Sequence, residues 1–149
     1  MSVRKSDIKK IILETKLEEV MVSPVITVKE MDDFAMVQEK IALYDVRHLP
    51  VVNESGTLAG LITQRDLYRI HSPRRLEDGS WYYDDEELHQ FLLMKVMTPK
   101  PFTLKPDNFL YEAIEATVLH KFGCIPIVDE SNKPCGIITR DTILKFLIV

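Results

Sequence analysis

The sequence predicts an α/β (α+β) protein built from two tandem β-α-β-β-α motifs. Three observations lead to this prediction: an internal repeat, a short strand followed by a helical apolar stripe in each copy, and a pair of strand segments after each helix. The 149 residues suffice for one ordinary domain or two small ones, and 46% hydrophobic with 28% charged residues is typical of a globular fold.

The internal repeat is the strongest signal. The two copies align without a gap over roughly fifty positions. Identical residues at a constant offset of 76 include Val20-Met21 with Val96-Met97, Thr27 with Thr103, Pro50 with Pro126, Gly60 with Gly136, and Ile62-Thr63 with Ile138-Thr139. This regularity indicates two copies of one supersecondary unit rather than a long solenoid.

Each copy opens with a strand and a helix. Residues 25–28 follow a proline and are rich in β-branched side chains, which predicts a short strand. Asp32 and Asp33 predict the start of a helix, because acidic side chains are favourable at a helix N-terminus. The expected buried stripe of this helix comprises Phe34, Val37, Ile41 and Val46.

The helix of the second copy has a corresponding stripe. Its expected buried positions are Leu110, Ala113, Ile114, Thr117, Val118 and Phe122. We expect Gly123 to end this helix in a left-handed conformation, which glycine adopts without steric cost.

A β-hairpin follows the helix in each copy. In the first copy, residues 49–53 form a continuous apolar run typical of a strand covered on both faces. Residues 54–57 predict a turn, and residues 58–63 predict the returning strand. The hydroxyl of Thr63 is then expected to cap the next helix, with Asp66 reaching back in a short-armed capping box.

Two segments lie outside the repeat. Residues 1–17 are expected to hold an amphipathic helix, whose apolar side comprises Ile8, Ile11, Ile12 and Leu13. Residues 73–94 are expected to link the motifs through a turn at 78–80, an aromatic cluster at 81–83 and a helix over 84–93. The motifs then occupy residues 18–72 and 95–149, and we expect them to be related by a pseudo-twofold axis.

These segments carry a family likeness. In the first copy it lies in residues 20–28, 48–52 and 60–67, and in the second copy in residues 96–99, 124–128 and 136–143. The two copies together resemble a pair of cystathionine-β-synthase-type (CBS) motifs, also called a Bateman module. The segment 88–97 also resembles stand-alone CBS proteins of the acetoin-utilisation type.

The resemblance implies a regulatory role. Such pairs have two clefts between their sheets, usually bind AMP, ADP, ATP or S-adenosylmethionine, and report that binding to a partner enzyme or channel. It also implies a homodimer formed through helices. No cofactor is expected to be required, and the sequence does not identify the regulated protein.

The residues at the strand-to-helix corner of the first copy predict nucleotide binding independently of the family resemblance. Helix amides attract an anion, the Asp66 carboxylate can accept hydrogen bonds from a ribose diol, and Arg65 can clamp a phosphate. Ile26 and its neighbours can give an apolar slot for a purine. The expected first site comprises Thr27, Val28, Arg47, His48, Leu49, Thr63, Arg65, Asp66 and Thr98. The same residues also have a purely structural interpretation, as a helix cap, solvated charges and a packed histidine.

The second copy departs from this pattern. Thr142 stands at the acidic position, whereas Asp141 lies one residue earlier and points about 100° away on the helix. Gly123 and Cys124 replace Arg47 and His48, so we expect weaker binding here. The expected second site comprises Ser23, Thr103, Ile125, Thr139, Arg140 and Thr142.

Other classes of protein fit less well. A net charge of −4 argues against a general nucleic-acid partner. No apolar run approaches the roughly 18–20 residues of a membrane span, and the N-terminus lacks a signal-peptide core, so we expect a cytoplasmic protein with no membrane partner. The four histidines are dispersed and no phosphate loop occurs, so neither a metal site nor an enzyme is predicted.

One alternative function stays open. The chain can instead be a ligand-free dimerisation or interaction platform, an interpretation that Thr142 favours for the second copy. Cys124 and Cys135 flank the second hairpin, and we expect them to be reduced packing residues.

Overall fold

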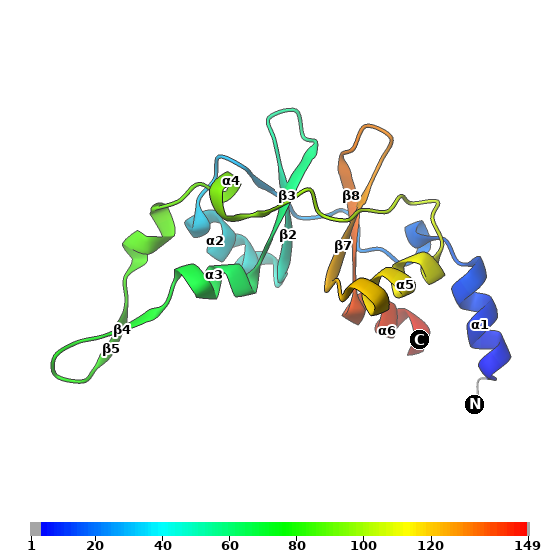
Figure 1. The fold of residues 1–149 in the computed structure, drawn as a ribbon, viewed down its shortest axis with the longest axis horizontal. Coiled ribbons are helices and arrows are strands. Elements are labelled where there is room, and N and C mark those ends of the chain that lie inside the picture. The colour runs from blue at the N-terminus through cyan, green and yellow to red at the C-terminus, as the bar shows by residue number, and fades with distance from the viewer. Residues whose placement is uncertain (1–3, 149) are drawn as a thin grey trace. The chain divides into compact units, whose positions relative to one another are not determined.

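The computed structural model describes residues 4–148, which form two compact units (Figure 1). The central unit comprises Ile26–Pro101. The terminal unit comprises residues 4–25 together with residues 102–148. Each unit contains the helices and the β-hairpin of one repeat, which confirms the predicted α/β class.

The central unit is built on a four-stranded sheet with the order β1-β2-β3-β6. Strand β1 pairs in parallel with β2, and the other pairings are antiparallel. The elements are β1 Val28–Lys29, α2 Phe34–Tyr44, β2 His48–Val52, β3 Leu58–Thr63, α3 Gln64–Ile70 and β6 Thr98–Pro99. The buried core consists of Val28, Phe34, Val37, Leu49, Val51, Ile62, Leu67, Leu88 and Leu93.

The linker forms a hairpin where a turn and a longer helix were expected. Its elements are β4 Pro73–Arg75, β5 Trp81–Tyr83, the 3₁₀ helix η2 Asp85–His89 and α4 Leu93–Val96. In Figure 1 this hairpin projects beyond the end of α3. The predicted helix over 84–93 is wrong, because the amides of Leu93 and Met94 donate to the carbonyls of Asp32 and Glu30 instead of continuing a helix.

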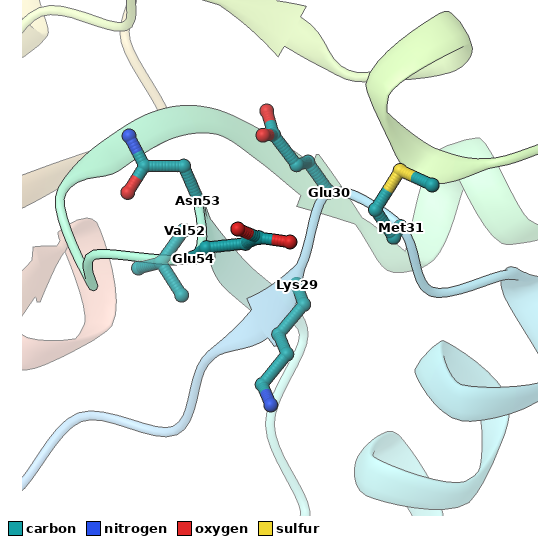
Figure 2. A pocket seen from close by; sticks show the side chains of 6 residues that line it. All are labelled: Lys29, Glu30, Met31, Val52, Asn53 and Glu54. Carbon is teal, nitrogen blue, oxygen red and sulfur yellow. The ribbon is translucent and has the colours of Figure 1, made fainter.

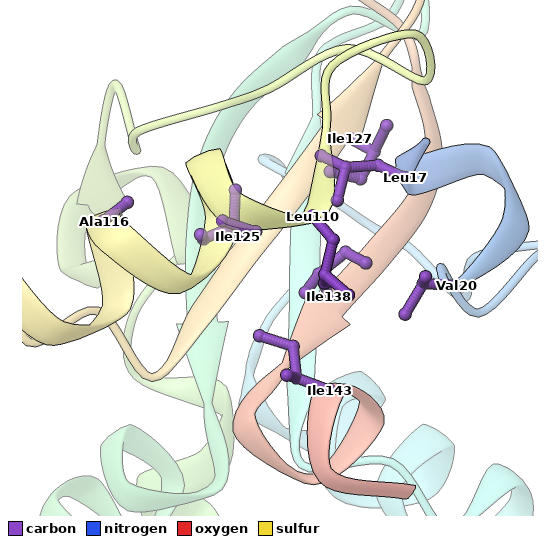
Figure 3. Packing of buried hydrophobic residues seen from close by; sticks show 9 residues of the cluster. Leu17, Val20, Leu110, Ala116, Ile125, Ile127, Ile138 and Ile143 are labelled. Carbon is purple, nitrogen blue, oxygen red and sulfur yellow. The ribbon is translucent and has the colours of Figure 1, made fainter. Parts of the chain in front are cut away.

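The terminal unit repeats the same plan around the β7–β8 hairpin. Its elements are α1 Lys5–Glu14, the 3₁₀ helix η1 Leu17–Glu19, α5 Leu110–His120, β7 Cys124–Val128, β8 Pro134–Thr139 and α6 Arg140–Ile148. Single bridges from Leu104 to Ile127 and from Val22 to Ile137 stand where β1 and β6 stand in the central unit. Figure 3 shows the aliphatic cluster that α5, α6 and the hairpin bury together.

Each unit is completed by residues from the start of the other repeat. Leu17 directly precedes the first repeat and Val20 lies within it, yet both side chains lie in the core of the terminal unit. Leu93 precedes the second repeat and is fully buried in the central unit. The Met97 side chain packs against Gly60, and the Met21 side chain packs against Gly136. Any larger residue at either glycine would overlap a methionine.

Four local predictions need correction. The first strand is shorter than residues 25–28, because pairing with β2 begins only at Val28. Helix α1 ends at Glu14, so Leu17 is buried as part of η1. Val118 is 67% exposed, and the stripe of α5 uses Ala116 instead.

The fourth correction concerns the end of α5. Lys121 (φ 57°), rather than Gly123, adopts the left-handed conformation. Asp45 (φ 52°) does the same at the matching position after α2. The helix therefore ends three residues before Gly123, and its end does not require the conformational freedom of a glycine.

Gly60→Ala tests the close approach of Met97. A Cβ at position 60 would overlap the Met97 side chain and lie 2.9 Å from the Thr98 carbonyl oxygen, a backbone atom that cannot move aside freely. We expect the free energy of unfolding in urea to fall by about 1–3 kcal/mol.

Gly136→Ala is the matched comparison, because its nearest neighbours are all side-chain atoms of Met21. Adding Met21→Ala should recover part of its loss, whereas adding Met97→Ala to Gly60→Ala should recover less. Equal stability of Gly60→Ala and the wild type would contradict this packing.

Candidate functional site

The strand-to-helix corner between β3 and α3 is organised around Thr63 and Asp66. The Thr63 amide and hydroxyl donate to Asp66 Oδ2 at 2.9 and 3.1 Å, and the Asp66 amide donates to Thr63 Oγ1 at 3.3 Å. This is the predicted capping box. It fixes a carboxylate at the first turn of α3, beside the positive end of the helix.

The second oxygen of Asp66 is held only loosely. Its Oδ1 lies 3.4 Å from Arg69 Nη1, near the limit of a hydrogen bond. The Asp66 side chain is 15% exposed, whereas Arg69 is 74% exposed. The sequence analysis missed Arg69, although the spacing of three residues on one helix is the signal that could have found it.

His48 and Arg47 lie at the same end of the sheet as this corner. His48 pairs with Thr63 across β2 and β3, and the Arg47 carbonyl accepts a 2.9 Å hydrogen bond from the Gln64 amide. Burial lowers the pKa of His48, and the neighbouring Arg47 charge lowers it further. Both effects favour the neutral form of the His48 ring. The side chains of Arg47 and Arg65 are exposed.

The other predicted residues of the first site have diverse environments. Val28 and Leu49 are fully buried and belong to the core of the central unit. The carbonyl of Thr27 accepts a hydrogen bond from Lys40 Nζ at 2.6 Å, a contact that no pattern in the sequence indicates. Thr98 is exposed and pairs with Leu61, two residues before Thr63.

The corresponding corner of the terminal unit has the same geometry with neutral groups. Thr139 Oγ1 lies 2.9 Å from Thr142 Oγ1, and the Thr142 amide donates to Thr139 Oγ1 at 3.2 Å. Asp141 faces away, in an exposed ion pair with Lys145 at 2.8 Å. A hydroxyl thus replaces the carboxylate of Asp66.

The remaining residues of the second site differ in exposure. Ile125 is buried in the core, and Arg140 is exposed. Thr103 is half-buried. The exposed Ser23 donates its hydroxyl to the Cys135 carbonyl at 3.0 Å, which ties the N-terminal segment to β8.

A surface pocket in the central unit lies away from the Thr63 corner. It is lined by Lys29, Glu30, Met31, Val52, Asn53 and Glu54 (Figure 2). Val52 is at the opposite end of β2 from His48, so the pocket lies roughly 13 Å along the strand from the corner. None of the residues predicted for the first site lines it.

Metal-ligating clusters, membrane-spanning helices and reactive thiols would each indicate another class of function. No cluster of metal-ligating side chains and no helix long and apolar enough to cross a membrane occurs among residues 4–148. Cys124 and Cys135 are both free thiols. Burial raises the pKa of Cys124 to about 12, so this thiol is protonated and acts as a packing residue.

Comparison with known proteins identifies a family. A family model described as CBS domain matches residues 17–72 and 93–149. The inosine-5'-monophosphate dehydrogenase of Methanocaldococcus jannaschii is 32% identical over 130 residues. That match covers 87% of this chain but 23% of the enzyme, so the chain spans about a quarter of the length of this relative.

Solved structures of CBS domain pairs share the fold. The CBS domain of a membrane protein from Sphaerobacter thermophilus has a TM-score of 0.79 and 24% identity, and the match covers 95% of this chain and 93% of that one. CBSX2 in complex with AMP has a TM-score of 0.71 and 22% identity, with 90% and 96% coverage.

Two further structures belong with these. The CBS domain pair of protein MJ0100, in complex with 5'-methylthioadenosine and S-adenosyl-L-methionine, has a TM-score of 0.71, 20% identity, and 89% and 94% coverage. AcuB from Vibrio cholerae, an acetoin utilization protein, has a TM-score of 0.71, 24% identity, and 89% and 90% coverage. Residues 88–97 resemble stand-alone CBS proteins of this type.

The central unit contains a second histidine, His89, whose pKa shifts in the opposite direction from that of His48. His89 Nδ1 lies 2.8 Å from Asp33 Oδ2, at the N-cap of α2. This hydrogen bond and the charge of Asp33 raise the pKa of His89. Partial burial alone would raise the pKa of Asp33, but hydrogen bonds from His89 and from two helix amides lower it on balance.

An NMR titration of the histidine ring protons tests both environments. We expect His48 to titrate below, and His89 above, the ordinary value of about 6.5. Folding stability from the His89 pair is full below pH 6.5 and is lost as the pH rises through its higher folded pKa. The His48 environment costs stability as the pH falls below 6.5.

Asp33→Asn is the control, and it should return only His89 towards its ordinary pKa. A His48 that titrates at or above 6.5 would be incompatible with the burial described above.

Proposed function

This chain belongs to the CBS domain family, and we propose that it is a regulatory module that binds an adenosine-containing ligand at the corner formed by Thr63 and Asp66. The observation that carries the proposal is the Asp66 carboxylate. It is fixed by Thr63 through one oxygen, while among residues 4–148 its other oxygen makes only the long contact to Arg69.

The chemistry of the corner fits a ribose with an attached phosphate. Asp66 Oδ1 can exchange the Arg69 contact for hydrogen bonds from a ribose diol, and such charge-assisted bonds are the stronger kind. No ion pair involves Arg47 or Arg65 in the described part of the chain, so both guanidinium groups are available to an incoming phosphate. AMP, ADP, ATP and S-adenosylmethionine are the candidate ligands.

The related structures support this class of ligand. AMP is bound by CBSX2, and 5'-methylthioadenosine and S-adenosyl-L-methionine are bound by the pair from MJ0100. The dehydrogenase activity of the longer relative belongs to a protein of which this chain matches less than a quarter. We therefore propose a binding role for this chain, and no reaction.

Regulation would work through a shift of populations. A ligand that prefers one arrangement of the two motifs increases the share of that arrangement and of the surface it offers to a partner protein. The available free energy is limited to the ligand's preference between the arrangements. In this proposal the Thr142 corner binds a phosphorylated nucleotide more weakly, because it lacks a carboxylate and the cations of the first copy.

Asp66→Asn tests the proposed site. The substitution keeps an oxygen that can accept from Thr63 but removes the charge that would hold the ribose. We expect calorimetry with AMP, ATP and S-adenosylmethionine to show binding of at least one compound to the wild type. The variant should bind that compound about tenfold more weakly.

Asp141→Asn is the matched control, since it removes an exposed carboxylate from the first turn of α6. Its affinity should stay within about twofold of the wild type. Unchanged affinity in Asp66→Asn, or no binding to the wild type at millimolar ligand, would refute the proposal.

A homodimer is the second candidate, and exposed apolar side chains favour it. Helices α5 and α6 of the terminal unit leave apolar residues uncovered, namely Val118, Leu119, Leu144 and Ile148. Groups of exposed apolar side chains of this kind often mark protein interfaces. In this alternative, the chain acts as an association platform whether or not a ligand is bound.

Leu144→Glu tests the platform. A buried charge at an interface is costly, so we expect light scattering to show a dimer for the wild type and a large shift towards monomer for the variant. Leu76→Glu, at an exposed leucine in the linker hairpin, is the control. A monomeric wild type at all concentrations would exclude the platform.

A further inference from the structure

An aromatic pair marks the terminal unit at the point where the central unit has aliphatic residues. The rings of Phe102 and Phe122 are stacked, with centroids 5.2 Å apart and planes inclined by 15°. His120 extends the group, its ring centroid 5.5 Å from that of Phe122. Phe102 is 41% exposed, so part of its ring is accessible from solvent.

The pairing of the strands places this stack at the Thr139–Thr142 corner. Leu104 pairs in parallel with Ile127, so Phe102, two residues earlier, lies level with Ile125 near the start of β7. Phe122 directly precedes β7, whose first residue pairs with Thr139. The open ring and the two hydroxyls therefore lie at the same end of the terminal unit.

The groups that would hold a phosphate in the first copy are lost here. At the repeat offset, Gly123 and Cys124 stand for Arg47 and His48, and Asp141 stands for Arg65. The replacement of Arg65 by Asp141 reverses a charge. The second copy has an aromatic pair that the first copy lacks, because Phe102 and Phe122 occupy the repeat positions of Ile26 and Val46.

We propose that the corner of the terminal unit takes an uncharged purine nucleoside, stacked on Phe102, rather than a phosphorylated nucleotide. The inference rests on the proposed function, because it assigns a ligand class to the second of the two corners. Every base presents a π-face, so an open phenyl ring attracts a purine whether or not phosphate is attached.

The polar groups of this corner support the same ligand class. The neutral Thr139 and Thr142 hydroxyls can exchange their mutual hydrogen bond for bonds to ribose hydroxyls, in which each acts as donor or acceptor. Asp141, which is ion-paired with Lys145, occupies the repeat position of Arg65, so this position supplies no guanidinium group for a phosphate. Arg140 remains as an exposed cation but stands for Gln64 of the first copy, one residue before the position of Arg65.

The experiment compares adenosine with AMP on the full chain carrying Asp66→Asn, in which the first corner is weakened. We expect calorimetry to show adenosine bound at least fivefold more tightly than AMP. Adding Phe102→Leu should weaken adenosine binding about tenfold, since stacking on one ring is lost. Phe102→Tyr keeps the ring and should retain adenosine affinity.

Two further variants separate specificity from folding. Phe91→Leu removes a phenyl ring of similar exposure from the central unit and should leave adenosine affinity unchanged. Gly123→Arg restores the cation of the first copy and should raise the affinity for AMP relative to adenosine. This gain does not depend on the stability of the Phe102 variants.

The outcomes distinguish the two proposals. The inference is overturned if AMP binds more tightly than adenosine to the Asp66→Asn chain, or if Phe102→Leu leaves adenosine binding unchanged. In either case, loss of AMP affinity between the wild type and Asp66→Asn would still support the proposed function. If neither adenosine nor any of the nucleotides binds to the wild type, both proposals fail.

Discussion

The packing of a methionine side chain against a glycine, once in each β-hairpin, is the contact on which both units depend. Met97 packs over Gly60 and Met21 over Gly136. In each case the methionine lies at the start of the other repeat, four residues after a leucine that is buried in the same unit, Leu93 or Leu17. A residue without a side chain is required where a methionine side chain lies this close to the hairpin backbone.

The two strand-to-helix corners show how one backbone arrangement can carry different chemistry. Both corners hold the third residue of the helix against the capping threonine, with an aspartate in one and a threonine in the other. The exchange preserves the cap and therefore the helix start. It removes a negative charge and shortens the side chain, so the corners differ in the ligands they can hold while remaining alike in fold.

Much of the fold could be predicted from the sequence because the repeat fixes the order of elements twice. The β2–β3 hairpin and the Thr63 cap are local features that residue type and spacing determine. Residues that depend on distant segments could not be predicted. The Lys40 side chain bonds the carbonyl of Thr27, and the amides of Leu93 and Met94 bond a loop sixty residues away, which prevents the expected linker helix.

The discontinuity of the terminal unit has a consequence for biosynthesis. The central unit is contiguous, so all of its residues have been synthesised once Pro101 is added. The terminal unit combines residues 4–25 with residues 102–148, so residues 4–25 cannot complete their packing until residues 102–148 have been synthesised. During translation the central unit can therefore fold first, and the apolar side chains of Leu17 and Val20 lack their final partners until residues 102–148 have been synthesised.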